Sequence, residues 1–122
     1  IENRVHFLEP RADTRDFFAG LDAFALSSRE DPFPLVAIQA AAQGVPVACF
    51  AQAGGAAELV GENAGAVVPY GDVSAMARAL ESWRFDVTFA AQIGQNAAQK
   101  ARKMCDVSVG APKILEFLEK RF

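Results

Sequence analysis

The stretch SSREDPFPLVAIQAAAQG, residues 27–44, decides the fold of this 122-residue chain. It follows a short run of β-forming residues, 23–26, and residues 35–43 have the composition of a helix that Gly44 ends. An acidic pair and a compact Pro-Phe-Pro turn separate the run from the helix. Residues 45–50 are again apolar and rich in β-formers. The segment therefore predicts a strand, a helix and a second strand, the unit from which parallel sheets are built.

The same alternation extends in both directions from this segment. Further strands are predicted at 5–8 and 66–69, and a short helix at 57–60. Asp13 is placed to cap a helix that buries Phe17, Phe18 and Leu21. Asp72 is placed to cap an amphipathic helix that buries Val73, Met76, Ala77, Leu80 and Trp83. Two more helices are predicted at 87–104, lined by Phe89, Ile93 and Ala97, and at 112–121, lined by Ile114, Leu115, Leu118 and Phe122.

The fold class predicted by this pattern is α/β, with a Rossmann-like parallel sheet that helices cover on both faces. Four strands are few for a complete doubly wound sheet. We therefore expect residues 1–122 to form one domain whose first strands lie upstream of Ile1 in a longer protein. Ligands bind such sheets beyond the carboxyl ends of the strands. Two loops fit that position, 27–34 and 50–55.

Composition excludes several other classes of function. Twelve basic and fifteen acidic residues give a net charge of −3, and the densest basic patch, Lys100 with Arg102 and Lys103, suits a solvated helix face, so no nucleic-acid partner is expected. Cys49 and Cys105 lie far apart and His6 is the only histidine, so we expect no metal, no disulfide and a reducing, cytoplasmic compartment. No apolar run approaches the roughly 18 residues of a membrane span.

The start of the predicted helix at residue 35 carries the chemistry of this segment. Proline is favoured at helix starts, because its missing N–H would have no intrahelical partner there, and Pro34 lies at this start. The amides of Leu35 and Val36 are then free donors at the positive end of the helix dipole, where anions bind. Gln39 lies one turn further on, roughly 6 Å from Leu35, within reach of a hydroxyl beyond a bound phosphate.

Three linked motifs make the comparison with a known family specific. They are acidic-x-Phe-x-Leu-Val-x-x-polar-Ala at 31–40, Gly-x-Pro-Val at 44–47 and Gly-Gly-x-x-Glu at 54–58. Together they resemble the donor-site signature of family-4 retaining glycosyltransferases (glycosyl transferases group 1), whose GT-B fold has two Rossmann-like domains. The resemblance covers the chain to about Trp83, and more loosely the helices beyond. It implies that this chain is the C-terminal, donor-binding domain, and that the acceptor domain is absent.

The resemblance also implies a role for each matching residue. Asp31 would face the transferred sugar as the catalytic carboxylate, although Glu30 is an alternative for that position. The loop backbone at Pro34, Leu35 and Val36 would surround the distal phosphate. Only the Leu35 and Val36 amides would donate hydrogen bonds to it, because proline has no N–H. The remaining donor-binding residues would be Phe33, Gln39, Gly54 and Gly55, with Gln39 bonding the ribose hydroxyls. The family's basic pair, which neutralises the diphosphate, is not identified here, because Arg4 lies too close to the predicted strand.

Two departures from the family pattern leave alternatives open. Asp31 is shorter than the usual glutamate, and Gln39 replaces a glutamate, which removes a charge-assisted hydrogen bond. Taken alone, the acidic pair is typical of a solvated turn before a helix, and Gln39 is typical of a surface position. The glycine pair alone indicates a turn, and Glu58 a carboxylate at a helix start. Phe33 alone indicates a side chain that packs the loop against the core. A non-catalytic binding or scaffold module is therefore the rival hypothesis. A dinucleotide-binding or receiver domain is poorly supported, because no G-x-G-x-x-G follows a strand.

The function predicted from the sequence is transfer of a sugar from a nucleoside-diphosphate sugar to an acceptor, with retention of configuration. The acceptor is unknown, with a saccharide or a lipid-linked saccharide as candidates. The partner would be the N-terminal domain of the same chain, and residues 1–122 alone would be inactive. The substrate is the sugar nucleotide, with no cofactor or metal expected. Peripheral attachment to an inner membrane through the missing domain is left open.

Overall fold

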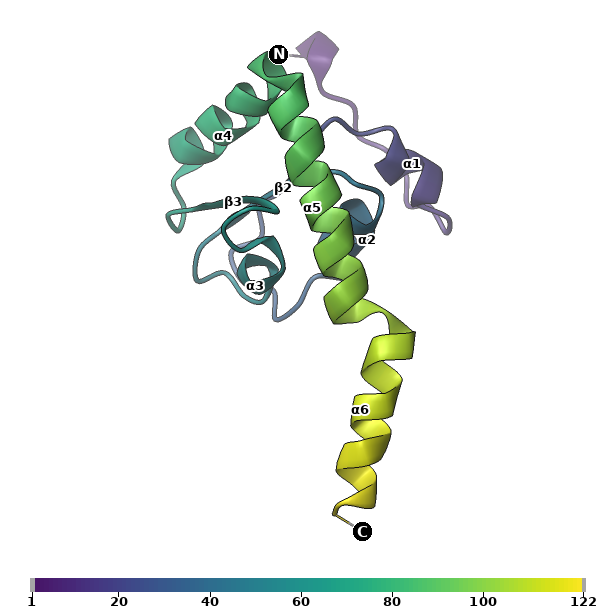
Figure 1. The fold of residues 1–122 in the computed structure, drawn as a ribbon. Helices are drawn as coiled ribbons and strands as arrows, with labels where there is room; N and C mark the ends of the chain where they lie inside the picture. The colour runs from purple at the N-terminus through teal and green to yellow at the C-terminus, as the bar shows by residue number, and fades with distance from the viewer. Residues whose placement is uncertain (1, 122) are drawn as a thin grey trace.

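The structure, a computed structural model, describes residues 2–121, in which short strands alternate with helices. The elements are η1 (Glu2–Arg4), α1 (Arg15–Ala19), β1 (Phe24–Leu26), α2 (Leu35–Ala42), β2 (Val47–Phe50), α3 (Ala56–Val60), β3 (Gly65–Val68), α4 (Val73–Phe85), α5 (Val87–Cys105) and α6 (Val107–Glu119). The three strands form one parallel sheet in the order β1-β2-β3, of which Figure 1 labels β2 and β3. The predicted α/β class with a parallel sheet is confirmed.

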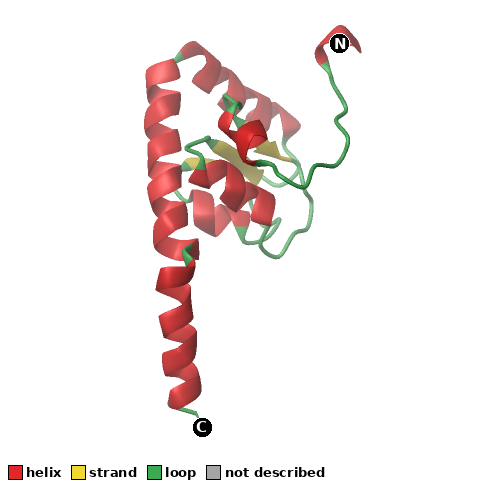
Figure 2. Ribbon diagram, turned by 90° about the vertical axis from the view of Figure 1, so that its right-hand side faces the viewer, coloured by secondary structure: helices red, strands yellow, loops and turns green. Residues whose placement is uncertain are grey.

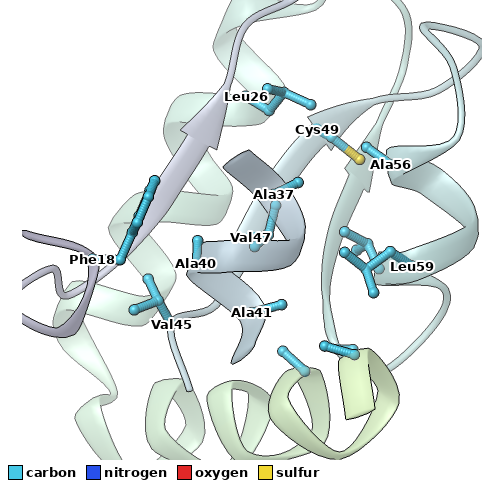
Figure 3. Close-up of a cluster of buried hydrophobic side chains, with 14 residues drawn as sticks. Phe18, Leu26, Ala37, Ala40, Ala41, Val45, Val47, Cys49, Ala56 and Leu59 are labelled. Atoms are coloured by element: carbon cyan, nitrogen blue, oxygen red, sulfur yellow. The ribbon is translucent and has the colours of Figure 1, made fainter. Parts of the chain in front are cut away.

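The central strand β2 divides the core into two parts. Its residues are all buried, and their side chains alternate between the faces of the sheet. Val47 and Cys49 join a cluster with residues of α1, α2, α3 and α5, whereas Ala48 and Phe50 join one with residues of α4 and α5. Helices thus cover both faces, as predicted. Figure 3 shows the first cluster, in which α2 packs against the sheet with small side chains: Ala37, Ala40 and Ala41.

Helix α4 begins as the sequence predicts. The Asp72 carboxylate accepts a hydrogen bond from the Ala75 amide at 2.8 Å, and Met76 and Trp83 are buried. The buried stripe is narrower than predicted, because Val73 is 72% exposed and Ala77 is also exposed. Ala77 lies about 100° around the helix from Met76, which turns it away from the core. Met76 and Trp83 are buried in the second cluster, and three half-buried residues of the same helix pack against it: Ala75, Ala79 and Leu80.

The strand predicted at 5–8 is wrong. These residues have no regular structure, and the side chain of Phe7 is 96% exposed. A strand needs a neighbour for its backbone N–H and C=O groups. In residues 2–121 the sheet has three strands, none of which pairs with 5–8. The apolar pattern of the segment therefore does not suffice to make it a fourth strand.

The first helix is shorter than the sequence suggests. Thr14, not Asp13, is the N-cap of α1, although the Asp13 carboxylate accepts a hydrogen bond from the Arg15 amide at 3.0 Å. The Arg15 side chain also bonds this carboxylate, which lowers the pKa of Asp13. Phe18 is buried as predicted, whereas Phe17 is 36% exposed because it lies on another face of this single turn and a half.

The C-terminal helices are found, but their apolar residues are less buried than predicted. In α5, Ile93 and Ala97 are buried, whereas Phe89 in the first turn is 50% exposed. Helix α6 begins at Val107 instead of 112, because the Asp106 carboxylate caps it by accepting from the Ser108 amide at 2.8 Å. Figures 1 and 2 show α6 extending away from the rest of the domain, and its predicted apolar lining is exposed: Ile114, Leu115 and Leu118. Phe122 lies outside the described residues.

No helix in the described part of the chain combines the length and the apolar character that crossing a membrane would require.

The Asp72 cap gives a prediction for stability. Asp72→Ala should lower the free energy of unfolding by about 1 kcal/mol, because the Ala75 amide loses its carboxylate partner. Urea unfolding followed by circular dichroism measures the change. Glu81→Ala, at an exposed position of the same helix, is the control and should change it by less than about 0.5 kcal/mol. Equal effects of the two substitutions would mean that the cap contributes nothing specific.

Candidate functional site

The loops that follow β1 and β2 lie side by side at one edge of the sheet. The Asp31 amide donates to the Ala53 carbonyl at 2.8 Å, and the Gly55 amide donates to the Pro32 carbonyl at 2.8 Å. Between these two hydrogen bonds, Asp31 and Gly54 form a parallel β-bridge. The structure therefore brings together the two loops that the sequence predicts as ligand-binding, and it does so at the carboxyl ends of the strands.

The start of α2 faces this edge with free donors. The helix begins at Leu35, as predicted, and Pro34 is its N-cap with φ −70° and ψ 117°. No side chain within residues 2–121 caps this end, and neither the Leu35 nor the Val36 amide donates a hydrogen bond to the protein there. Leu35 is 71% exposed and Val36 41%. The helix start is therefore open to an anion.

The predicted side chains differ in how close they lie to the bridge. Asp31 is half-buried and forms the bridge itself, whereas Glu30 is exposed on the preceding position. Gln39 is exposed in the second turn of α2. Pro34 is buried, and Phe33 is 39% exposed. Of the two acidic residues, Asp31 is the one whose backbone position is fixed by the neighbouring loop.

Gly54 is required by the geometry of the bridge. Its φ is +132°, a region in which residues other than glycine are rare. A Cβ atom at this position would also lie 1.7 Å from the Asp31 carbonyl oxygen. Glycine therefore serves close approach of the two loop backbones. This structural role accounts for Gly54 without any contact to a ligand.

Sequence reasoning missed two residues at the same edge. Gln52 follows β2 and, among residues 2–121, is the one non-glycine residue with positive φ, at 60°. A strained conformation of this kind is characteristic of functional loops, but the amino-acid pattern carries no signal for it. Tyr70 follows β3, is 52% exposed, and has its ring centroid 6.3 Å from that of Phe50. The sequence signal that could have identified Tyr70 is its position directly after the predicted strand 66–69.

The structure provides no sign of thiol or metal chemistry at this edge. Cys49 is buried within β2, and this burial raises the pKa of its thiol, so it stays protonated and unreactive. Across residues 2–121, no three histidine, cysteine or acidic side chains are grouped as a metal site would require. The reactive groups of the edge are therefore carboxylates, amides and backbone donors.

A separate cavity of about 540 Å³ lies at the opposite end of the sheet. Its walls include residues that precede β1 and β2, together with the α4–α5 junction: Leu21, Asp22, Ala23, Pro46, Leu80 and Trp83. None of the predicted site residues lines it. Because ligands of parallel α/β sheets bind at the carboxyl ends, we place the candidate site at the loop edge and not in this cavity.

Comparison with known proteins identifies a family that this chain matches over most of its length. Residues 1–84 match the sequence model of the family described as Glycosyl transferases group 1. The lipopolysaccharide core biosynthesis glycosyltransferase LpsE of Rhizobium meliloti (strain 1021) is 35% identical over 81 residues, which are 66% of this chain and 24% of LpsE. The chain therefore spans about a quarter of the length of that relative.

Solved structures with the same fold include nucleotide complexes. Anabaena HepE in complex with UDP has a TM-score of 0.91 and 34% identity, over 98% of this chain and 33% of that one. HepE in complex with UDP-glucose matches with a TM-score of 0.88. Sucrose-phosphate synthase from Thermosynechococcus elongatus has a TM-score of 0.79 and 27% identity, over 87% of this chain and 27% of that one.

The close approach at Gly54 predicts a large effect of a single methyl group. Gly54→Ala should lower the free energy of unfolding by about 2 kcal/mol or more, because it adds a clash with the Asp31 carbonyl to the cost of the backbone conformation. Gly71→Ala is the matched control, since Gly71 has φ +72° and open space around its Cβ position. Thermal unfolding should show a smaller loss for Gly71→Ala, and equal losses would contradict the close-approach interpretation.

Proposed function

Because the chain belongs to the glycosyl transferases group 1 family, we propose that it is the donor-binding domain of an enzyme that transfers a sugar from a nucleoside-diphosphate sugar. The observation that carries the proposal is the uncapped start of α2 at the carboxyl edge of the sheet. The complexes of HepE with UDP and UDP-glucose support a uridine nucleotide as the donor. The donor would lie over the bridged loops, between Asp31 and Gln39.

The backbone of α2 supplies the first part of donor recognition. The Leu35 and Val36 amides point out of the helix start, where the helix dipole favours negative charge. They would donate hydrogen bonds to the distal phosphate of the diphosphate. The same donors would stabilise the negative charge that develops on the departing diphosphate, which is where electrostatic catalysis acts in this reaction. A basic pair from another part of the protein would complete the neutralisation, and no metal is required for it.

Side chains supply the second part of donor recognition. Asp31 would face the transferred sugar, and its bridge to Gly54 fixes the backbone from which the carboxylate extends. Gln39 would accept a hydrogen bond from the ribose hydroxyls, since it lies one turn after the phosphate-binding amides. As a neutral amide it makes a weaker bond than the glutamate that is usual at this position. We therefore propose weaker nucleotide binding than in members that retain the glutamate.

The complete reaction needs groups that residues 1–122 do not supply. We propose that transfer proceeds with retention of configuration, that a second domain binds the acceptor, and that the two domains close around the donor. This chain alone would bind the donor without transferring its sugar. The shorter Asp31 and the neutral Gln39 favour one rival, a binding or scaffold module that has kept the fold without catalysis.

Nucleotide titration followed by protein NMR tests the donor site. UDP added to about 1 mM should shift the amide resonances of Leu35, Val36 and Gln39, because a phosphate at the helix start changes the environment of these groups. Amides of α6, which extends away from the rest of the domain, are the internal control, and their resonances should not shift. Absence of shifts with UDP and with other nucleoside diphosphates would reject the donor site.

The role of Gln39 predicts a gain from restoring the carboxylate. Gln39→Glu should tighten UDP binding about 5-fold, because hydrogen bonds to a charged acceptor contribute roughly 1 kcal/mol more than neutral ones. Inorganic pyrophosphate, which has no ribose, should not bind more tightly to this variant. Gln43→Glu adds the same charge at an exposed position of the same chain segment and serves as the control. Unchanged UDP affinity of Gln39→Glu would place the ribose elsewhere.

A further inference from the structure

Gly55 has a backbone that any residue could adopt, yet it has no room for a side chain. Its φ of −71° and ψ of −9° lie in the right-handed helical region, and the residue is buried. A Cβ atom there would lie 2.1 Å from Cδ2 of Phe33 and 2.6 Å from the Pro32 carbonyl oxygen. The requirement for glycine is therefore one of space, and the group that fills most of this space is the Phe33 ring.

The Phe33 ring belongs to the segment that leads directly into the phosphate-binding amides. Only Pro34, with its φ fixed near −70°, separates Phe33 from Leu35. Two backbone hydrogen bonds hold the same segment, one from Asp31 to Ala53 and one from Gly55 to Pro32. The ring against Gly55 is a third attachment, and it lies closest to the helix start.

The loop that receives the ring is itself held on both sides. The Ala51 amide donates to the Val68 carbonyl of β3 at 2.7 Å, and Gly55 is the N-cap of α3. Leu59 and Val60 of α3 are each 1% exposed, so this helix is anchored in the core. The Phe33 ring thus packs against a part of the structure that has its own attachments to the core, apart from those to loop 27–34, here called the donor loop.

We propose that Phe33 and Gly55 form a positioning pair that holds the Leu35 and Val36 amides in the orientation that the donor diphosphate requires. This inference rests on the proposed function for its ligand. Donors held in place before binding cost no ordering when the nucleotide arrives, which raises affinity without any added contact. Phe33 and Gly55 therefore act through the backbone of the donor loop and not by touching the nucleotide.

The alternative is that Phe33, which is 39% exposed, contacts the nucleotide directly. The two roles differ in the protein without ligand. A positioning ring fixes the helix start before binding, so its removal lowers the backbone order of the Leu35 and Val36 amides when no nucleotide is present. A ring that only contacts the nucleotide leaves the backbone order of these amides unchanged when it is removed.

A double-mutant cycle on UDP affinity tests whether the two residues act together. Phe33→Ala and Gly55→Ala should each weaken UDP binding about 10-fold, because small displacements of binding groups are costly. Phe33→Ala/Gly55→Ala should weaken binding by less than the product of the two single losses, because the clash with the ring disappears once residue 33 is alanine and only the clash with the Pro32 carbonyl remains. Losses that multiply in the double variant would show that the residues act independently and would overturn the proposal.

The second readout needs no ligand. The ¹⁵N-relaxation order parameters of the Leu35 and Val36 amides, measured without nucleotide, should fall in Phe33→Ala and in Gly55→Ala, because both variants loosen the helix start. Phe85→Ala, at an 80% exposed ring, and Gly110→Ala, with open space around its Cβ position, are the matched controls and should change neither amide. If the site variants also leave both amides unchanged, the positioning role is wrong even where UDP affinity falls. If the wild-type protein binds no nucleotide, the proposed function is wrong. The ligand-free measurement on the Leu35 and Val36 amides would still show whether Phe33 and Gly55 position the helix start.

Discussion

The parallel bridge between Asp31 and Gly54 is the contact on which the geometry of the candidate site depends. It joins the loops after β1 and β2, and two hydrogen bonds of 2.8 Å flank it. Parallel strands place their carboxyl ends at one edge, but the bridge turns two neighbouring loops into one surface. Asp31 and the start of α2 belong to one loop, and the support below them comes from the other. The catalytic carboxylate and the phosphate donors that we propose are therefore held by the same contact.

Much of the fold could be predicted from local patterns, because the elements that form it carry their own signals. Gly44 ends α2, Asp72 caps α4, and the apolar runs before the loops become β1 and β2. Residues 5–8 show the limit of this reasoning. Their apolar alternation is typical of a strand, but strand formation depends on a neighbour that is distant in sequence, and no described strand pairs with them. The exposed apolar residues of α6 show the same limit, since helical periodicity predicts a face but not what covers it.

The candidate site likewise has parts that could be predicted from the sequence and parts that could not. The start of α2 at Leu35 follows from Pro34 and the composition after it, and the structure confirms that start. The parts that hold the site could not be predicted, because they are contacts between segments that lie far apart in the sequence. The sequence indicates a turn at the glycine pair, but it cannot show that Gly54 approaches Asp31 or that the Phe33 ring fills the space beside Gly55. Positive φ at Gln52 likewise has no local signal in the sequence. The roles of Asp31 and Gln39 toward a ligand remain proposals that the fold permits.

A crystal structure of the protein with UDP bound tests the donor site most directly. We expect the distal phosphate within hydrogen-bond distance, about 2.7–3.2 Å, of the Leu35 and Val36 amide nitrogens, with the ribose beside Gln39. The loop backbone from Asp31 to Pro34 should match the ligand-free structure, because the bridge already holds it. UDP bound in the cavity at the opposite end of the sheet, or a phosphate away from the start of α2, would contradict this donor site.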